Sequence, residues 1–399
     1  MFDRLLKDQS ALARHRTSPL VEERLAYLTH LANQGYARDT LQRTASELLL
    51  VVKLLGLSEM PRKALTRDDV KYKTANHRHL FRLAVRWLKF LERLQQLPTP
   101  PSRFAKQIRA FVDHMKQEAF RPETIRGSCG FVTRFLDRLD VKIDSLHKIT
   151  PDQIDMAFRK LFTPGGYSRT TIRGCASRLR SFFRFAETRG WCRRGLASAI
   201  CAPRVYSQTS LPQGPSWDDV RRLLAMTEGD KPHNIRARAI LMLLAIYGLR
   251  RGEVSRLRLE DFDWEHEVFQ VISSKTGRSR AYPLVRSVGD AILRYLKEVR
   301  PRSSHREVFL SLRAPFRPVH TSLWIMVGLR LRSLNLSLPH YGPHALRHAC
   351  ATRLVAAGLS LKEIGDQLGH TDPDTTRIYA KVDLTSLREV ADFDMGGVL

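Results

Sequence analysis

The sequence predicts a mainly α-helical protein of several domains, in which helical N-terminal modules precede a mixed α/β domain of mostly helices with a small antiparallel sheet. One observation is length, because 399 residues with 43% hydrophobic content suffice for two or three domains with separate cores. Another is a succession of runs rich in Leu, Val, Trp and Arg, which indicate helices. The third is residues 267–284, where β-branched and aromatic residues flank a Lys-Thr-Gly turn, as in a hairpin.

Two helical blocks, residues 1–97 and 102–200, are separated by the Pro-rich break at residues 98–101. They resemble each other at an offset of 84 residues, and a slip of 11 residues then places Trp87 opposite Phe182. The first matches are Ala26, Tyr27, Leu28, His30 and Leu31 with Ala110, Phe111, Val112, His114 and Met115. A duplicated helical module explains these matches, and chance alignment of two amphipathic blocks is the alternative.

Residues 202–215 contain Pro, Ser, Gln and Gly with little apolar periodicity, which predicts an interdomain linker. The third domain follows over residues 216–385. Ser216 is placed to cap its first helix, and a buried helix is expected from about Ile235 to Tyr247, before the hairpin. We expect the remainder of this domain to be helical, and residues 386–399 form a C-terminal tail.

The stretch from His344 to Tyr379 has well-marked helix ends. Gly358 and Gly369 each end a helix, and Ser360 with Glu363 forms a capping box that begins the second one. A short third helix then leads to Tyr379. Polar residues therefore lie at helix ends while the apolar residues between them supply a core.

The net charge of the chain indicates what kind of partner it binds. Lys and Arg total 67 against 40 acidic residues, a formal net charge of +27 with a pI near 10.5, so a polyanion is expected and nucleic acid is the foremost candidate.

A membrane span would need about 20 apolar residues, and the longest apolar run, residues 239–249, stops at Arg250. The charged N-terminus does not resemble a signal peptide, so we expect a cytoplasmic protein. Five cysteines without a CxxC pair argue against a disulfide framework and a zinc cluster.

A series of motifs occurs in the last part of the chain. A Gly-Leu-Arg sequence is followed by a glutamate, a lysine in the hairpin turn, a His-x-x-Arg motif, a Leu-Gly-His motif and a tyrosine nine residues later. The residues are Arg250, Glu253, Lys275, His344, Arg347, His370 and Tyr379. In this order they resemble the tyrosine recombinase family, also called phage integrases. The resemblance is strongest over residues 212–385, moderate over 102–200 as the family's SAM-like core-binding domain, and weak over 1–97.

The resemblance implies a mixed α/β catalytic domain of the tyrosine recombinase type over residues 216–385, and metal- and ATP-independent transesterification. Attack on a DNA phosphodiester builds negative charge on the non-bridging oxygens, which the guanidiniums of Arg250 and Arg347 would hold by bidentate hydrogen bonds. Tyr379 would attack the phosphorus, forming a 3′-phosphotyrosyl link and releasing a 5′-hydroxyl. No cofactor is expected, because the link conserves the phosphoester energy and arginines neutralise the phosphate. The sequence has no phosphate-binding GxxxxGK[ST] loop and no acidic two-metal cluster.

The remaining motif residues also receive roles from the resemblance. Lys275 would be the general acid that protonates the leaving oxygen. His344 would act as a base or hydrogen-bond partner near the tyrosine, His370 would bind the scissile phosphate, and Glu253 would orient the framework. The arginines expected to contact DNA are Arg126, Arg169, Arg173, Arg178, Arg180 and Arg278.

The expected partners are double-stranded DNA with specific recombination sites and three further copies of the chain, in a homo-tetramer that joins two duplexes through a Holliday junction. The tail would dock on a neighbouring protomer, and accessory or sister recombinases are further candidates. Residues 1–97, as an additional module, favour a mobile-element integrase in a prokaryotic host, acting at the nucleoid.

Three alternatives remain at this point. His344 and His348 lie four residues apart, as zinc ligands do on a helix, but Ala345 stands where zinc proteases carry their glutamate. A type IB topoisomerase would share the chemistry but relax supercoils as a monomer. A DNA-binding protein that has lost catalysis is the third reading, against which the intact set of motif residues argues.

Overall fold

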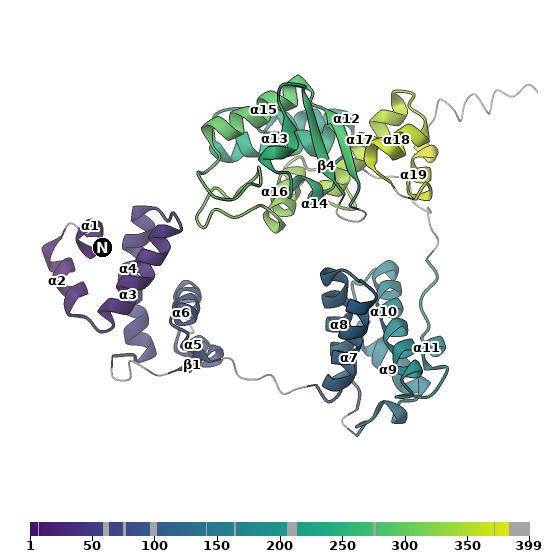
Figure 1. The fold of residues 1–399 in the computed structure, drawn as a ribbon, viewed down its shortest axis with the longest axis horizontal. Coiled ribbons are helices and arrows are strands. Elements are labelled where there is room, and N and C mark those ends of the chain that lie inside the picture. Colours follow the sequence, from purple (N-terminus) through teal and green to yellow (C-terminus); the bar gives the residue numbers. More distant parts are fainter. Residues whose placement is uncertain are drawn as a thin grey trace, which may run out of the picture. The chain divides into compact units, whose positions relative to one another are not determined.

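The computed structural model describes residues 1–6, 8–58, 64–74, 77–95, 102–140, 142–162, 165–205, 214–273, 277–370 and 372–382 (Figure 1). Helices dominate, and a small antiparallel sheet lies in the last part of the chain, which confirms the predicted fold class. The chain divides into two compact units, one made of residues 1–95 with 210–399 and the other of residues 96–209. No helix within the described ranges is long and apolar enough to span a bilayer.

The first helical block builds its own core. Its helices are α1 (Phe2–Leu5), α2 (Gln9–Thr17), α3 (Val21–Asn33), α4 (Arg38–Leu55), α5 (Arg67–Lys73) and α6 (Arg78–Phe90). Strands β1 (Leu65–Thr66) and β2 (Leu94–Gln95) pair in parallel. Leu28, Leu48, Val51 and Trp87 are fully buried where α3, α4 and α6 meet. The apolar face of each helix therefore supplies the core, and its polar face is left to solvent.

The second helical block has an aromatic core. It consists of α7 (Ala105–Gln117), α8 (Pro122–Leu136), the 3-10 helix η1 (Leu146–Lys148), α9 (Pro151–Phe162), α10 (Arg169–Thr188) and α11 (Leu196–Ala199). Phe111 and Phe182 meet edge to face at 5.4 Å between ring centroids, and Phe135 and Phe183 are fully buried beside them. Such edge-to-face pairs add to the apolar area that the rings bury.

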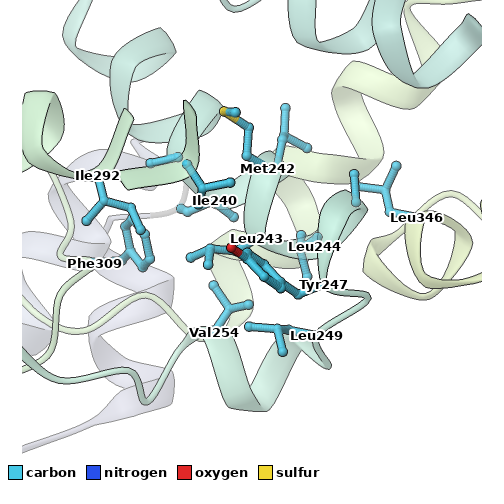
Figure 2. Close-up of a cluster of buried hydrophobic side chains, with 14 of the residues drawn as sticks. Ile240, Met242, Leu243, Leu244, Tyr247, Leu249, Val254, Ile292, Phe309 and Leu346 are labelled. Atoms are coloured by element: carbon cyan, nitrogen blue, oxygen red, sulfur yellow. The ribbon is translucent and has the colours of Figure 1, made fainter. Parts of the chain in front are cut away.

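The last part of the chain surrounds α13. Its elements are α12 (Trp217–Ala225), α13 (Pro232–Ile246), α14 (Arg251–Val254), η2 (Leu259–Asp261), β3 (Phe262–Asp263), β4 (Val268–Ile272), β5 (Ser279–Pro283), α15 (Arg286–Glu298), α16 (Thr321–Arg332), α17 (Pro343–Ala356), α18 (Leu361–Leu368), α19 (Asp374–Arg377) and η3 (Ile378–Val382). The helix α13 packs against α15 and α17. Ile240, Leu243 and Leu244 are at most 1% exposed (Figure 2). This confirms the predicted buried helix, and its burial fixes the position of the turn that follows it.

The predicted hairpin is also confirmed. Strands β4 and β5 pair antiparallel with Val268 opposite Pro283 and Ile272 opposite Ser279. The short strand β3 adds to the other edge of β4, and two residues were too few to be recognised in the sequence. The expectation that the rest of this domain is helical is wrong for residues 300–320, which contain no helix. Pro301, Pro315 and Pro318 lie in this segment, and proline removes the backbone donor that a helix interior needs.

The predicted helix ends are found at the expected residues. Ser216 forms a capping box with Asp219 at the start of α12, and Ser360 forms one with Glu363 at the start of α18. Gly369 ends α18 in the left-handed conformation, with a φ of 63°. Because caps of this kind satisfy the free N–H and C=O groups of a helix, the elements around Tyr379 have fixed boundaries.

Candidate active site

The turn after α13 depends on Gly248, which has a φ of 60°. A β-carbon at this position would lie 2.4 Å from Cδ2 of Leu368, at the end of α18. Only glycine combines this backbone conformation with such a close approach. The turn leads the chain away from the buried helix and places Arg250 as the N-cap residue of α14.

Replacing Gly248 by alanine is expected to destabilise the domain by more than the conformational cost alone. The left-handed conformation costs about 1–2 kcal/mol for a residue with a side chain, and the clash with Leu368 adds roughly 1–3 kcal/mol of overpacking. Gly358 provides the matched control, because its φ is 81° but nothing lies within 4 Å of a β-carbon built there. Urea unfolding of both variants measures the difference, and equal destabilisation would contradict the steric argument.

Arg250 is held by two neighbours. Its Nη1 donates to Oε1 of Glu253 at 3.1 Å, and its Nη2 donates to the carbonyl oxygen of Gly369 at 3.0 Å. The backbone N–H of Arg250 donates to Oε2 of Glu253 at 2.8 Å. The side chain of Glu253 is only 1% exposed, so its charge interacts with this arginine and aligns it.

Arg280, on β5, is a second arginine bound to Glu253, and the sequence analysis did not identify it. Its Nη2 donates to Oε1 of Glu253 at 2.9 Å, and its Nη1 donates to the hydroxyl of Tyr282 and to the carbonyl oxygen of Gln367. One buried carboxylate therefore joins α14 to the hairpin. No local motif marks Arg280, because its partners Glu253 and Gln367 are distant in the sequence.

Arg347 is almost completely buried, at 2% exposure. It donates to the carbonyl oxygens of Gly248 and Leu368, both at 2.7 Å. Burial, together with the charge of Arg250, lowers its pKa to about 10. The guanidinium thus remains charged at neutral pH while it ties α17 to the ends of α13 and α18.

Arg250 and Arg347 line the same cavity, which has a volume of about 770 Å³. The ionisable side chains of this lining are those of arginine, histidine and tyrosine, and none is a carboxylate. The lining residues are Leu249, Arg250, Arg251, Gly252, Arg256, Trp324, Arg332, Pro339, His340, Tyr341, Gly342, Pro343, His344 and Arg347. Such a concentration of guanidiniums suits the binding of a phosphate group.

His344 and His348 lie one turn apart on α17, with ring centroids 4.5 Å apart. The side chain of His344 is exposed and lines the cavity. Surrounding protein atoms and the charges of Arg347 and Arg250 lower its pKa. Within the described ranges no group of three His, Cys, Asp or Glu side chains is placed to hold a metal ion. Of the two histidines, His348 also contacts a residue outside α17.

This residue outside α17 is Tyr379. Its hydroxyl lies 2.9 Å from Nδ1 of His348, so the histidine beside the tyrosine is His348 rather than His344, which we expected there. In the sequence, the four-residue spacing alone does not distinguish this contact from a zinc pair. Burial lowers the pKa of His348 to about 4, which leaves Nδ1 free to accept a proton from the phenol.

Tyr379 lies in η3 and is 2% exposed. Burial raises its pKa to about 12, although the charge of Arg347 acts in the opposite direction. The tyrosine is absent from the lining of the large cavity. In this conformation its hydroxyl is neutral and buried.

His370 follows the glycine that ends α18. Its backbone N–H donates to the carbonyl oxygen of Gly365 at 2.8 Å, and its Nδ1 lies 2.7 Å from Oγ1 of Thr376. Burial lowers its pKa to about 4, and nearby arginines contribute. These bonds fix the ring at the junction of α18 and α19.

Lys275 lies outside the described residues. Ser273 and Arg278, which flank it in the sequence, line a cavity of about 290 Å³ together with Arg280 and His370. The root of the hairpin is thus close to one of the expected site residues.

Acid is expected to weaken the fold through His348 and His370. Each pKa lies near 4 in the folded chain against 6.5 for a free histidine, so the unfolded chain binds more protons. The free energy of unfolding therefore falls as the pH drops below 6.5, by on the order of 2 kcal/mol per histidine between about pH 7 and pH 5. Urea unfolding measures it.

The control for this pH effect is substitution of the exposed His233 by glutamine. A His348→Gln variant should lose part of the pH dependence between about pH 7 and pH 5, whereas His233→Gln should retain it. Identical pH profiles for the wild type and His348→Gln would contradict the assignment.

The arginines expected to contact DNA do not all have the same surroundings. Arg126, Arg169, Arg173 and Arg178 are exposed on α8 and α10. Arg180 instead donates two hydrogen bonds to the carbonyl oxygen of Ile200, at 3.1 and 2.8 Å. The guanidinium of Arg180 therefore holds the segment after α11.

Comparison with known proteins identifies similar families and relatives. The model described as "Phage integrase family" matches residues 216–385, and the one described as "Phage integrase, N-terminal SAM-like domain" matches residues 108–190. A putative integrase/recombinase of Sinorhizobium fredii, y4rA, is 35% identical over 299 residues, which cover 73% of this chain and 71% of the relative. Tyrosine recombinase XerC of Alcanivorax borkumensis is 34% identical over 233 residues, covering 57% of this chain and 74% of the relative.

A solved structure has the same fold. It is the XerH site-specific recombinase bound to palindromic difH substrate as a post-cleavage complex, with a TM-score of 0.58 and 16% identity, covering 75% of this chain and 98% of that one. At this identity the likeness concerns the fold alone. The identity to the Sinorhizobium relative, together with the family matches over residues 108–190 and 216–385, decides the family. This chain belongs to the phage integrase family, the tyrosine recombinases.

Proposed function

We propose that this protein is a site-specific DNA recombinase that cuts and rejoins DNA strands through a 3′-phosphotyrosyl intermediate. The observation that carries the proposal is the shared position of α17. This helix contributes Arg347 and His344 to the cavity lined with arginines, and His348 to a hydrogen bond with the buried Tyr379. One helix thereby carries residues of a surface suited to phosphate together with the proton acceptor of the proposed nucleophile, which lies in η3.

In the proposed reaction a DNA phosphate binds between Arg250 and Arg347. The guanidiniums hold the charge that develops on the non-bridging oxygens. The oxygen of Tyr379 forms a bond to phosphorus, its proton passes to His348, and the bond from phosphorus to the 5′-oxygen breaks. Lys275 supplies the proton that the leaving oxygen needs, and His370 contacts the phosphate. Rejoining reverses these steps, and because the link conserves the phosphoester energy, neither ATP nor a metal is included in the proposal.

The buried nucleophile requires a movement. Tyr379 is 2% exposed and does not line the cavity, so it reaches a bound phosphate only after η3 shifts. The segment consists of five residues in a 3-10 helix, a conformation whose hydrogen bonds are weaker than those of an α-helix. We infer that the position of this segment controls when the tyrosine reacts.

The proposed organisation places a core-binding domain at residues 102–200, a linker at 202–215 and the catalytic domain at 216–385, after an additional module at 1–97. In this proposal four copies join two DNA duplexes through a Holliday junction, with the tail at 386–399 docked on a neighbouring copy; residues 383–399 lie outside the described range. Accessory or sister recombinases, a mobile-element origin, and a cytoplasmic location at the nucleoid of a prokaryote belong to the same proposal.

The test is strand exchange between two marked recombination sites. A recombinase yields products in which the flanking DNA is exchanged, whereas an enzyme of the type IB topoisomerase kind only relaxes supercoils. A protein that merely binds DNA gives neither product and no covalent adduct. Relaxation without exchange, or binding without an adduct, would contradict the proposal.

DNA binding by the wild type is expected to weaken steeply with salt. Each phosphate neutralised by a lysine or arginine releases counterions, so the logarithm of the binding constant should fall with the logarithm of the salt concentration at about 0.9 per contact. A filter-binding or fluorescence titration at several salt concentrations measures this slope. A flat response would contradict the phosphate contacts assigned to the arginines.

A further inference from the structure

The outer face of α6, in the first helical block, is a continuous basic stripe. Arg78, Arg82, Arg86 and Lys89 are all exposed, and their spacing of four, four and three residues places them on one side of the helix. The helix contains no acidic residue. In the described part of the chain none of the four forms a salt bridge with a carboxylate. Their charges are therefore left for an external partner.

The opposite face of α6 is fixed. Leu80, Ala84, Trp87 and Leu88 are at most 3% exposed and lie in the core of the first block. Their burial prevents the helix from rotating about its axis. The basic stripe is thus presented to solvent by a rigid element, over about 16 Å of helix axis, which equals the axial span of roughly five phosphates of one DNA strand.

The first block resembles the second block in the order of its helices and in local hydrogen bonds at equivalent positions. The backbone N–H of Tyr36 donates to the carbonyl oxygen of Leu31, and 84 residues later that of Phe120 donates to the carbonyl oxygen of Met115, so the turns after α3 and α7 close alike. The starts of α5 and α9 also agree. Thr66 exchanges hydrogen bonds with Asp69, and Thr150 does so with Gln153.

The stripe on α6 has a counterpart on α10. With the predicted offset of 95 residues for this pair, four of the five buried positions of α6 meet a buried position of α10, and the pairs are Leu80 with Cys175, Ala84 with Leu179, Trp87 with Phe182 and Leu88 with Phe183. The exception is Leu83, which falls on the exposed Arg178. The same offset places Arg78 on Arg173 and Lys89 on Arg184, all of them exposed. Arg82 and Arg86 fall on Ser177 and Ser181, which are exposed polar residues. The two helices therefore expose equivalent faces, and that of α6 carries more charge.

We propose that the α6 face formed by Arg78, Arg82, Arg86 and Lys89 is a second DNA-binding surface, which holds the phosphates of duplex DNA without reading its sequence. Duplex DNA is the partner because the face is wholly basic and because its counterpart α10 lies in the segment that matches the SAM-like domain of phage integrases. The surface would extend the contact of the chain along the duplex. This inference rests on the proposed function, since it requires that the chain act on DNA.

The test compares full-length variants on a long random-sequence duplex, which suffices because phosphate contacts do not depend on sequence. The variant Arg78→Gln, Arg82→Gln, Arg86→Gln should lower the salt slope of binding by about 0.9 per lost contact, about 2.7 in total. The matched control replaces three exposed cations on α2 and α4, as Arg14→Gln, Arg43→Gln, Lys53→Gln. The control removes the same charge and should lower the slope by less than one contact.

A thermal unfolding curve shows whether the triple variant folds, and all three replaced side chains are exposed. If it fails to fold, the single variant Arg82→Gln should lower the slope by about 0.9. A slope equal to that of the wild type, or an equal loss in the control, overturns the proposal. Failure of the proposed recombinase function would look different, because the wild type would then form no covalent adduct with DNA. Failure of the α6 proposal alone leaves the adduct intact and shows only in the salt slope.

Discussion

Replacing Tyr379 by phenylalanine is expected to abolish the covalent DNA adduct. The substitution removes the one oxygen that the proposed reaction joins to phosphorus and leaves the ring in its buried site. Its hydrogen bond to His348 is also lost, at a cost of about 1–3 kcal/mol for an unsatisfied buried partner. DNA binding should survive, because the cavity lined with arginines does not include the tyrosine. A nicked suicide substrate, analysed on a denaturing gel, measures the adduct.

The matched control for the loss of the nucleophile is Tyr295→Phe. Tyr295 is also fully buried in this part of the chain, and its hydroxyl accepts a hydrogen bond from the backbone of Leu310, remote from the cavity. The control should keep the adduct, while the unpaired backbone N–H of Leu310 should cost about 1–3 kcal/mol of stability, the same range as for Tyr379→Phe. An adduct formed by Tyr379→Phe would show that another residue attacks the phosphorus, and the mechanism would be wrong.

Replacing Arg250 by lysine is expected to lower the rate of adduct formation by roughly 10²–10³-fold, the usual effect of removing one preorganised donor to a developing negative charge. Lysine keeps the charge but lacks the planar fork of a guanidinium. It therefore cannot contact Glu253 and the carbonyl oxygen of Gly369 and still present a second donor to the phosphate. Single-turnover cleavage of the suicide substrate gives the rate.

Arg251 is the control for Arg250, because it is the next residue, lines the same cavity and is exposed. Of the two neighbours only Arg250 is aligned by the buried Glu253. Arg251→Lys should therefore change the rate by less than about tenfold, as expected for a mobile surface charge. Equal losses in the two variants would contradict the assignment of Arg250 as the guanidinium that binds the scissile phosphate.

Much of the fold follows from local signals. Ser216 and Ser360 begin helices with capping boxes, and Gly369 ends one, since these groups satisfy neighbouring backbone atoms only a few residues away. The apolar run of α13 indicates burial on all sides, and the structure confirms it. Residues 300–320 escaped prediction because their prolines and isolated bridges, such as Leu310 with Pro318, produce neither helical nor strand periodicity.

The candidate site could be predicted only as far as its motifs reach. Arg250 and Arg347 follow from the resemblance to a family, yet they lie 97 positions apart along the chain and line one cavity only in the folded structure. Arg280 lacks any local signal because its role arises from contacts with Glu253 and Gln367. Long-range hydrogen bonds between buried polar groups depend on the packed structure, and no sequence pattern reports them.

The two hydrogen bonds from Arg347 to the backbone affect how variants at this position are interpreted. The guanidinium donates to carbonyl oxygens at the ends of α13 and α18. Folding of the domain therefore already fixes its orientation, and a bound phosphate would meet a charge that needs no rearrangement. Arg250, in contrast, is 32% exposed at its side chain. Loss of activity in an Arg347 variant therefore combines the loss of these two internal hydrogen bonds with the loss of a proposed phosphate contact.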